Sequence, residues 1–188
     1  HWIGGMGVLV FVLALIPKSE GQDMFLMKAE VPGPVVGKLV SKVHMTARIL
    51  YGIYAFLTVI EIIFLLFGWM PLFDSIVHAF STAGTGGYAI KNSSIAFYNS
   101  YYIDMVVTVF MLLFGINFNL YYLLLLKDFK QIFKSEELRW YILIIAVFTG
   151  IITVNTLSIY GNISESFRYS IFQVVSIITT TGFATTDF

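Results

Sequence analysis

The chain has 188 residues, of which 58% are hydrophobic and only 12% are charged, about half the charged fraction of an ordinary soluble domain. Its 11 basic and 11 acidic residues cancel, so there is no basic surplus to hold nucleic acid and no acidic tail that would suggest a soluble partner. The lack of cysteine excludes a disulfide framework and any thiolate metal site.

Apolar stretches of two lengths follow one another along the chain. About 20 apolar residues are needed to cross a bilayer, and the candidate spans are 2–16 (short for a full span), 49–70, 100–126 and 140–160. Two further stretches, 72–82 and 167–178, hold about a dozen residues each, which is half a membrane. Thr and Gly follow each of the two instead of a charged turn, so we expect re-entrant half-helices that return the chain to the side it came from.

Basic residues predict the orientation of these segments. Segments 17–48 and 127–139 carry nine of the 11 basic side chains, and only Lys91 and Arg168 lie elsewhere. The positive-inside rule puts both basic segments on the cytoplasmic side. The half-helices and their loops are then expected to open from the outside.

The two half-helices and their loops repeat each other at an offset of 95 residues. Residues 76–81 align with 171–176, and the loop sequence 85–89 (TGGYA) aligns with 180–184 (TTGFA). Thr, Gly and Ala match in register, and Tyr pairs with Phe. Repeated units in membrane transporters usually surround one central path, so we expect the two loops to face a common path.

The loops have the composition that binding of a dehydrated cation requires. Potassium channels replace the water shell of the ion with backbone carbonyls from Gly-rich loops, and Gly tolerates the backbone angles that this needs. A Thr adds a hydroxyl oxygen, an aromatic residue holds the loop width, and the half-helix points its negative end at the ion. A single Gly after a helix usually only ends that helix, but the repetition favours an ion path. The candidate residues are Thr85, Gly86, Gly87, Tyr88, Thr180, Thr181, Gly182 and Phe183, with potassium bound through the backbone at Gly87 and Gly182.

Several other polar residues have a structural explanation beside a functional one. Glu61 is a costly carboxylate within a span, and it is expected either in a contact with a neighbouring unit or in a vestibule. Asp74 and Asp104 stand where an acid stabilises a helix N-terminus, although either could also attract cations. His78 is too isolated to be a metal ligand and is expected to pack between helices. Asn117 is expected to bond across helices. Close helix approach is expected at Gly4, Gly5 and Gly7.

Taken together, these motifs resemble those of the Trk/Ktr-type potassium transporter family. The resemblance covers essentially the whole chain and is carried by the strings 1–7 (HWIGGMG), 28–30 (KAE), 32–34 (PGP), 73–89 (FDSIVHAFSTAGTGGYA), 115–118 (GINF) and 172–185 (FQVVSIITTTGFAT). It implies an all-α integral membrane fold of pseudo-repeated helix–pore-loop–helix units, as in potassium channels. The units expected are 1–16, the inner helix closing a first unit; 17–45, a cytoplasmic linker; 46–127, a second unit; 128–138, a second cytoplasmic linker; and 139–188, a third unit that stops after its loop.

The resemblance also implies a function. Four such units in one subunit surround a single selectivity filter, to which Gly87 and Gly182 would contribute here, with further carbonyls from Thr85, Gly86, Thr180 and Thr181. Members are multi-pass proteins of the cell membrane that take up potassium and need no cofactor. They typically form homodimers and are gated by a cytoplasmic, nucleotide-binding regulatory subunit. The first and fourth loops and the gate would lie outside this chain, and His1 in place of Met fits an internal piece of a longer protein.

Two alternatives to a passive potassium path stay open at this point. Interrupted helices also build the substrate sites of alternating-access cation symporters. A non-conducting membrane scaffold is the other possibility, because two loops alone cannot encircle an ion. No Ser–His–Asp set or catalytic carboxylate pair is apparent in the sequence, so we expect no enzyme.

Overall fold

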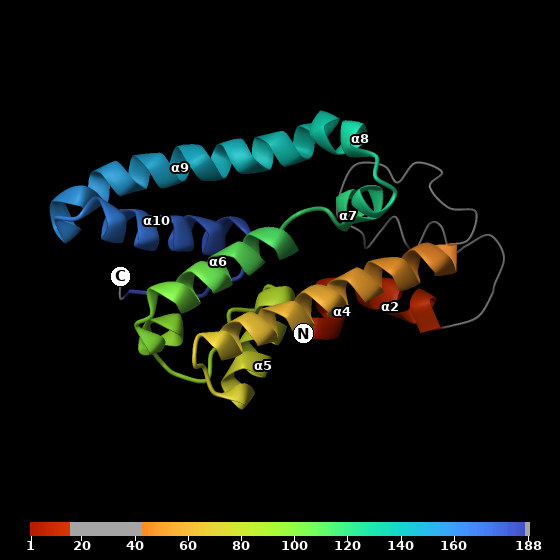
Figure 1. The fold of residues 1–188 in the computed structure, drawn as a ribbon, viewed down its shortest axis with the longest axis horizontal. Helices are drawn as coiled ribbons and strands as arrows, with labels where there is room; N and C mark the ends of the chain where they lie inside the picture. The colour runs from red at the N-terminus through yellow and green to blue at the C-terminus, as the bar shows by residue number, and fades with distance from the viewer. Residues whose placement is uncertain (16–42, 187–188) are drawn as a thin grey trace.

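The fold of the described chain is entirely helical, as the sequence predicts. The computed structural model describes residues 1–15 and 43–186, and within these ranges all regular elements are helices (Figure 1). They are α1 (Trp2–Gly5), α2 (Val8–Leu15), α4 (Val43–Phe67), α5 (Leu72–Ala83), the 3-10 helix η1 (Ser94–Tyr98), α6 (Tyr101–Phe114), α7 (Phe118–Leu125), α8 (Phe129–Lys134), α9 (Glu136–Tyr160) and α10 (Ile163–Ile178).

Among the described residues two helices, α4 and α9, are long and apolar enough to cross a membrane, and the bent pair of α6 and α7 makes a third if it is one span. Helices α4 and α9 each have 25 residues, which is about 37 Å of helix. On α4, Leu50, Tyr54 and Leu65 are buried, whereas Phe56 and Phe67 on another face are 64% and 73% exposed. A helix that is apolar on its exposed face as well as on its buried face suits a lipid environment.

The two predicted half-helices are present. Helix α5 has 12 residues, or about 18 Å, and α10 has 16 residues, or about 24 Å. Helix α10 begins earlier than the apolar pattern predicts, because the Asn162 side chain accepts a hydrogen bond from the Ser164 N–H and caps a polar first turn. Neither helix is long enough to cross a bilayer.

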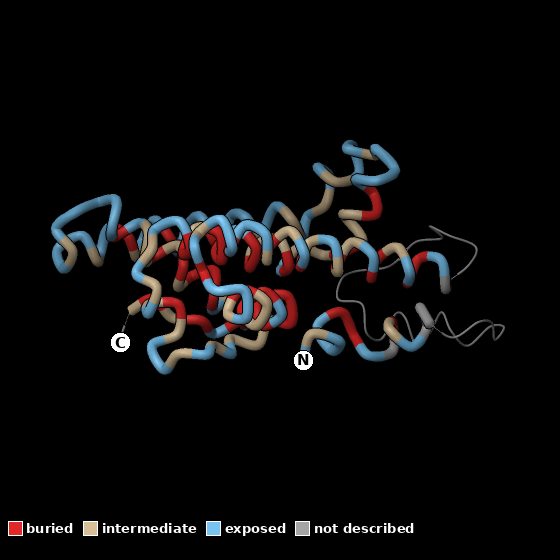
Figure 2. The backbone as a smooth tube through the Cα atoms, turned by 60° about the horizontal axis from the view of Figure 1, so that its bottom comes forward, coloured by how far each residue is buried: buried red, intermediate tan, exposed pale blue. Residues whose placement is uncertain are grey.

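Each half-helix packs against the long helix that precedes it in the chain. Helix α5 lies against α4, α10 lies against α9, and α6 contacts both half-helices (Figure 1). Buried positions gather in the middle of the molecule, where these helices and the loops after α5 and α10 meet (Figure 2). The core therefore surrounds the two loops.

The first apolar stretch is broken and does not form one helix. Gly7, with φ of 100°, separates α1 from α2. Two tyrosines of α4 reach the carbonyl groups next to this break: the Tyr54 hydroxyl donates to the Trp2 oxygen at 2.8 Å, and the Tyr51 hydroxyl donates to the Ile3 oxygen at 2.7 Å. The expectation of one continuous helix over 2–16 is wrong here, because hydropathy carries no information on backbone angles.

The apolar stretch 100–126 is also divided. Helices α6 and α7 meet at an angle of 85°, and Gly115 ends the first while Asn117 caps the second through the Asn119 N–H. Tyrosine hydroxyls again satisfy the carbonyls next to the break. Tyr141 donates to the Leu112 oxygen at 3.2 Å, and Tyr121 donates to the Leu113 oxygen at 2.7 Å. Asn117 thus caps a helix at a bend and not at mid-span, but it does bond across helices as predicted, since its Nδ2 donates to Glu137 Oε2 of α9 at 3.1 Å.

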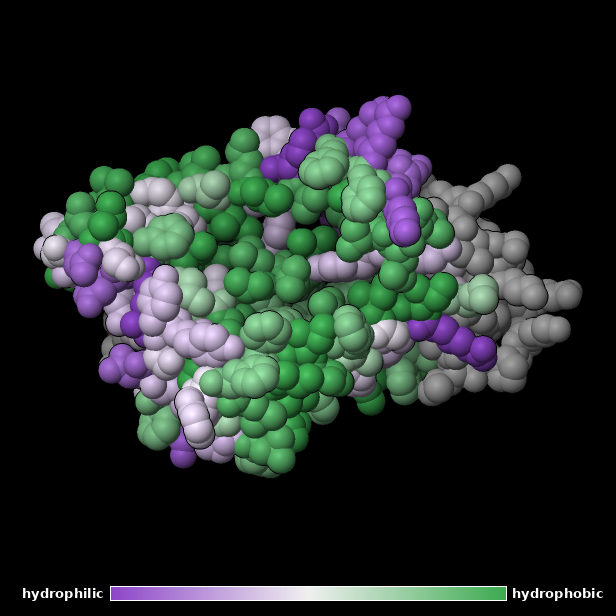
Figure 3. Space-filling model, viewed as in Figure 1, coloured by the Kyte–Doolittle hydropathy of each residue, from purple (hydrophilic) through white to green (hydrophobic). Residues whose placement is uncertain are grey.

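The distribution of charge agrees with the predicted orientation as far as the described residues allow. Helix α8 and the start of α4, which carry Lys130, Lys134 and Arg48, lie at one end of the molecule, and the start of α10, which carries Arg168, lies at the opposite end (Figure 1). Between the two ends the visible surface is largely hydrophobic (Figure 3). Most of the linker 17–45, with the basic residues Lys18, Lys28, Lys38 and Lys42, lies outside the described residues.

Two adjacent glycines of α1, Gly4 and Gly5, provide a matched test of how closely α1 packs against the end of α5. A Cβ at Gly5 would lie 2.7 Å from the Gly84 Cα and 2.5 Å from the Tyr54 hydroxyl, whereas a Cβ at Gly4 would meet nothing within 4 Å. We expect Gly5→Ala to lower the free energy of unfolding by about 1–3 kcal/mol through overpacking, and Gly4→Ala not to lower it, because Ala favours the helix and its Cβ meets no atom there. Thermal unfolding of the full-length protein in detergent measures this. Equal stability of the two variants would contradict the close approach of α1 to α5.

Candidate functional site

The loops after the two half-helices have the same backbone conformation. Thr85 and Thr180 both have positive φ, 52° and 58°, and Gly87 and Gly182 follow with φ of 63° and 85°. Positive φ is uncommon for a threonine and readily adopted by glycine. The conformational repeat is therefore in the same register as the sequence repeat.

Hydrogen bonds at the ends of the half-helices repeat as well. The N–H of Gly86 donates to the Ser81 oxygen at 2.8 Å, and in the other loop the N–H of Thr181 donates to the Ser176 oxygen at 2.9 Å. In the same way, the N–H of Thr85 donates to the Thr82 oxygen, and the N–H of Thr180 donates to the Ile177 oxygen. These bonds satisfy the last helical carbonyls and turn the chain out of each helix in the same direction.

The two loops touch each other. A Cβ built at Gly87 would overlap the carbonyl oxygen of Thr181 and would lie 3.2 Å from the Gly182 Cα. Residue 87 must therefore be glycine for two reasons: a side chain would clash with the other loop, and the backbone has a positive φ. At Gly182 a Cβ would meet no atom within 4 Å, so only the φ of 85° favours glycine there. The structure therefore brings the two predicted glycines together, although 95 residues separate them in the sequence.

Backbone carbonyls of these loops lack partners. Among the described residues, no hydrogen bond reaches the carbonyl oxygens of Thr85, Gly86, Gly87, Thr180, Thr181 and Gly182. Of these six residues Thr181 is buried, Thr85, Gly86 and Gly87 are partly buried, and Thr180 and Gly182 are exposed in the described chain. Backbone that leaves helix at membrane depth survives only where protein or a water-filled cavity satisfies it. The two adjacent loops thus present unpaired oxygens of the kind that a dehydrated cation needs.

The aromatic residues of the two loops differ in their surroundings. Phe183 is fully buried, and its carbonyl accepts a hydrogen bond from Ser176 Oγ at 2.7 Å. Tyr88 is 63% exposed and meets the ring of His1 edge-on, with centroids 5.3 Å apart. Of the threonine hydroxyls, Thr181 Oγ1 bonds Thr179 Oγ1 at 2.8 Å. Phe183 is therefore packed into the core, whereas Tyr88 is exposed and contacts the ring of His1.

Residues of the second unit hold the loop of the third. Ser94 Oγ accepts a hydrogen bond from the Ala184 N–H at 3.2 Å, and the Ala96 N–H donates to the Ala184 oxygen, also at 3.2 Å. Ser94 and Ala96 belong to η1, which follows the first of the two loops. This link sets the spacing between the loops, and the sequence offered no sign of it.

A polar contact anchors η1 to the half-helix α5. The Tyr98 hydroxyl donates to Asp74 Oδ2 at 2.5 Å. The pKa of Tyr98 is raised, mainly because the hydroxyl is buried and also because the Asp74 carboxylate lies next to it. His78 lies between Tyr98 and Phe183, with ring centroids 5.6 Å and 5.8 Å away. The prediction that His78 packs between helices is confirmed. Asp74 lies in the first turn of α5, as expected, and also has a specific partner.

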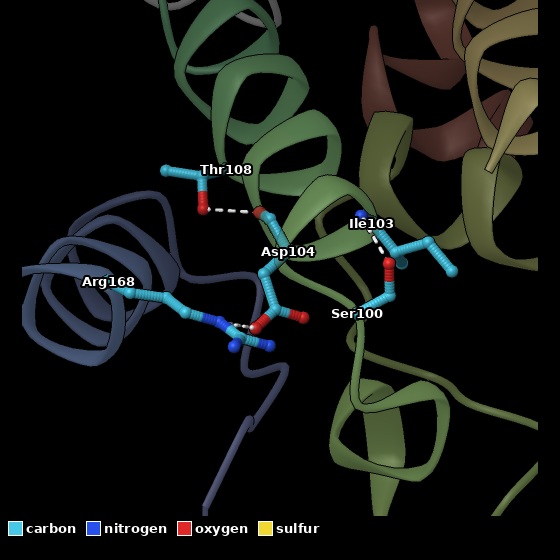
Figure 4. A network of polar contacts seen from close by, with 5 residues as sticks. All are labelled: Ser100, Ile103, Asp104, Thr108 and Arg168. Carbon is cyan, nitrogen blue, oxygen red and sulfur yellow. Dashed lines mark hydrogen bonds and ion pairs between the residues drawn. The ribbon is translucent and has the colours of Figure 1, made fainter. Parts of the chain in front are cut away.

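An ion pair joins α6 of the second unit to α10 of the third. Arg168 Nε lies 2.8 Å from Asp104 Oδ2, with 12% and 2% of the two side chains exposed (Figure 4). Thr108 donates to the backbone oxygen of Asp104, and Ser100 accepts the Ile103 N–H at the start of α6 (Figure 4). Because Asp104 is paired and buried, the alternative that it attracts cations from solution is wrong for this structure.

Glu61 is fully buried in α4. Neither of its carboxylate oxygens has a hydrogen-bond partner among the described residues. Burial leaves it no face toward water in the described chain, which argues against the vestibule role, and no described residue of another unit forms a hydrogen bond with it. Among the described residues no group of three or more His, Asp or Glu side chains lies where it could hold a metal ion.

These features together define a polytopic membrane protein of the pore-loop class: apolar crossing helices, half-helices, and glycine loops that meet between repeated units. The chain belongs to the TrkH family, whose model, described as a cation transport protein, matches residues 1–188. The resemblance drawn from the sequence is therefore confirmed. A family of transport proteins also agrees with the expectation that the chain is not an enzyme.

Individual relatives cover the chain almost completely. The Trk system potassium uptake protein TrkH of Salmonella typhimurium is 35% identical over 98% of the chain, and TrkG of Escherichia coli is 33% identical over all of it. The crystal structure of the potassium transporter TrkH from Vibrio parahaemolyticus matches with a TM-score of 0.78 and 29% identity over 98% of the chain. This chain spans 39% of the length of the two relatives and 37% of that of the solved chain.

The Asp104–Arg168 pair provides a test of how the units are joined. Asp104→Asn leaves the Arg168 guanidinium without its anion, and we expect it to lower the free energy of unfolding by about 3–5 kcal/mol. Exposed Glu165, on the same half-helix, serves as the control through Glu165→Gln, which should have little effect. Thermal unfolding of the full-length protein measures both. The joint replacement of Asp104 and Arg168 by Leu should recover most of the loss; if it is as unstable as Asp104→Asn, the ion pair is not the cause.

Proposed function

We propose that this chain supplies two of the loops of a potassium-selective path and that the complete protein takes up potassium across the cell membrane. The observation that carries the proposal is the set of unpaired carbonyl oxygens on two loops in contact. Potassium channels coordinate the ion through such backbone oxygens. The relatives are named potassium uptake proteins, which supports potassium as the transported ion.

The loop residues divide into two roles in this proposal. Carbonyls of Thr85, Gly86 and Gly87 and of Thr180, Thr181 and Gly182 replace the hydration shell of potassium. Tyr88 and Phe183 hold the loops at the width that the ion requires. The C-terminal ends of α5 and α10 lead into the loops, so their negative helix ends favour a cation there.

The partners belong to the proposal as well. A homodimer and a cytoplasmic, nucleotide-binding regulatory subunit are inferred from the family resemblance. The described basic segment 127–139 and the start of α4, which carries Arg48, lie at one end of the molecule (Figure 1), and by the positive-inside rule this end faces the cytoplasm. A regulatory subunit would meet the protein from this end.

The loop glycines are the direct test. Gly87→Ser and Gly182→Ser in the full-length protein disturb the backbone at positive φ, and we expect roughly tenfold slower rubidium uptake or relaxed rubidium-over-sodium selectivity. Cells without other potassium uptake systems, in potassium-limited medium, provide the assay. Gly161→Ser is the matched control, because Gly161 has φ of 65° but caps α9 away from the loops.

Two outcomes would count against the proposal. Unchanged uptake and selectivity in both loop variants would remove these glycines from the ion path. Alternatively, if single-channel recordings of the purified protein show no discrete openings while uptake proceeds, an alternating-access symporter with interrupted helices explains the transport better.

A further inference from the structure

A strip of exposed apolar and basic residues follows the bend between α6 and α7. Leu125, Phe129 and Phe133 are 62%, 52% and 76% exposed. Lys127, Lys130, Lys134 and Arg139 are exposed beside them. We call these residues, together with Leu124 and Leu126, the α7–α8 strip.

The bend places the strip at the end of a membrane-crossing helix. Asn117 Nδ2 donates to Glu137 Oε2 at 3.1 Å, and the Tyr141 hydroxyl reaches the Leu112 oxygen, so the bend is fastened to the first two turns of α9. Helix α9 is long enough to cross the bilayer from this level. The angle of 85° then turns α7 along the membrane surface instead of through the membrane.

The charges of the strip are available to a partner. None of Lys127, Lys130 and Lys134 forms an ion pair with another described residue. The nearby acid Asp128 is occupied within α8, because it accepts hydrogen bonds from the N–H and the side chain of Gln131. Hydrophilic side chains gather around α8 at this end of the molecule (Figure 3).

We propose that the α7–α8 strip is a binding surface for anionic phospholipid headgroups of the inner leaflet. Its leucines and phenylalanines enter the boundary between headgroups and acyl chains, and its lysines meet the phosphates, as in interfacial amphipathic segments. A lipid is favoured over a protein partner because the strip continues into the exposed apolar surface of α9. There Arg139 and Trp140 line a hollow of about 400 Å³ with Glu136 and Leu143, and tryptophan is enriched at membrane interfaces. The proposal does not depend on the ion path.

Depth measurements on the full-length protein test the position of the strip. Spin labels at Phe133→Cys and, as the control on another face of α8, at Gln131→Cys are compared in nanodiscs of phosphatidylcholine with phosphatidylglycerol. We expect the label at 133 to collide mainly with oxygen, as at the acyl boundary, and the label at 131 to collide with a water-soluble nickel reagent. Equal exposure of both labels to the nickel reagent would overturn the proposal, as would a label at 133 that leaves water only when a cytoplasmic partner protein is added.

Lipid preference tests the charges. The variant with Lys127, Lys130 and Lys134 all changed to Gln is compared with the natural protein by native mass spectrometry in mixed phosphatidylglycerol and phosphatidylcholine micelles. Each lysine removed should lower the preference for phosphatidylglycerol about fivefold, whereas Lys91→Gln, in the loop before η1, should not change it. An unchanged preference in a triple variant of unchanged melting temperature would overturn the proposal.

Discussion

Backbone that leaves the helix inside a membrane must find partners for its polar groups, and this constraint separates two kinds of helix break in the chain. At the α1–α2 and α6–α7 breaks, tyrosine hydroxyls satisfy the nearby carbonyls: Tyr51 and Tyr54 in the first, Tyr121 and Tyr141 in the second. In the loops after α5 and α10, the carbonyls of residues 85–87 and 180–182 have no partner among the described residues. At the two structural breaks the protein itself supplies the hydrogen-bond donors, whereas the two loops keep carbonyl oxygens that an ion can bind.

Contacts between units hold the loops in this state. The spacing of the third unit's loop comes from η1 of the second unit through Ser94 and Ala184, and from His78 of α5 against Phe183. The Asp104–Arg168 pair fixes α10 to α6 at the other end of the half-helix. The loop of the third unit is thus positioned in part by residues of the second unit, and these contacts join residues far apart in the sequence.

Sequence patterns predicted the elements that a local signal determines. The half-helices were identifiable because α5 and the apolar part of α10 are too short to cross and end in Thr and Gly, and the 95-residue repeat aligned Gly87 with Gly182 correctly. The breaks at Gly7 and Gly115 escaped prediction, because the apolar runs 2–16 and 100–126 have the hydropathy of continuous spans. Long-range partners such as Arg168 for Asp104, 64 residues apart, carry no local pattern at all.

The central claim is that the loops at 85–87 and 180–182 bind one alkali ion jointly through main-chain oxygens. A crystal structure of the full-length protein soaked in rubidium tests this directly. We expect an anomalous peak within coordination distance of carbonyl oxygens from both loops. Well-ordered loops whose carbonyls point away from every rubidium peak would contradict it.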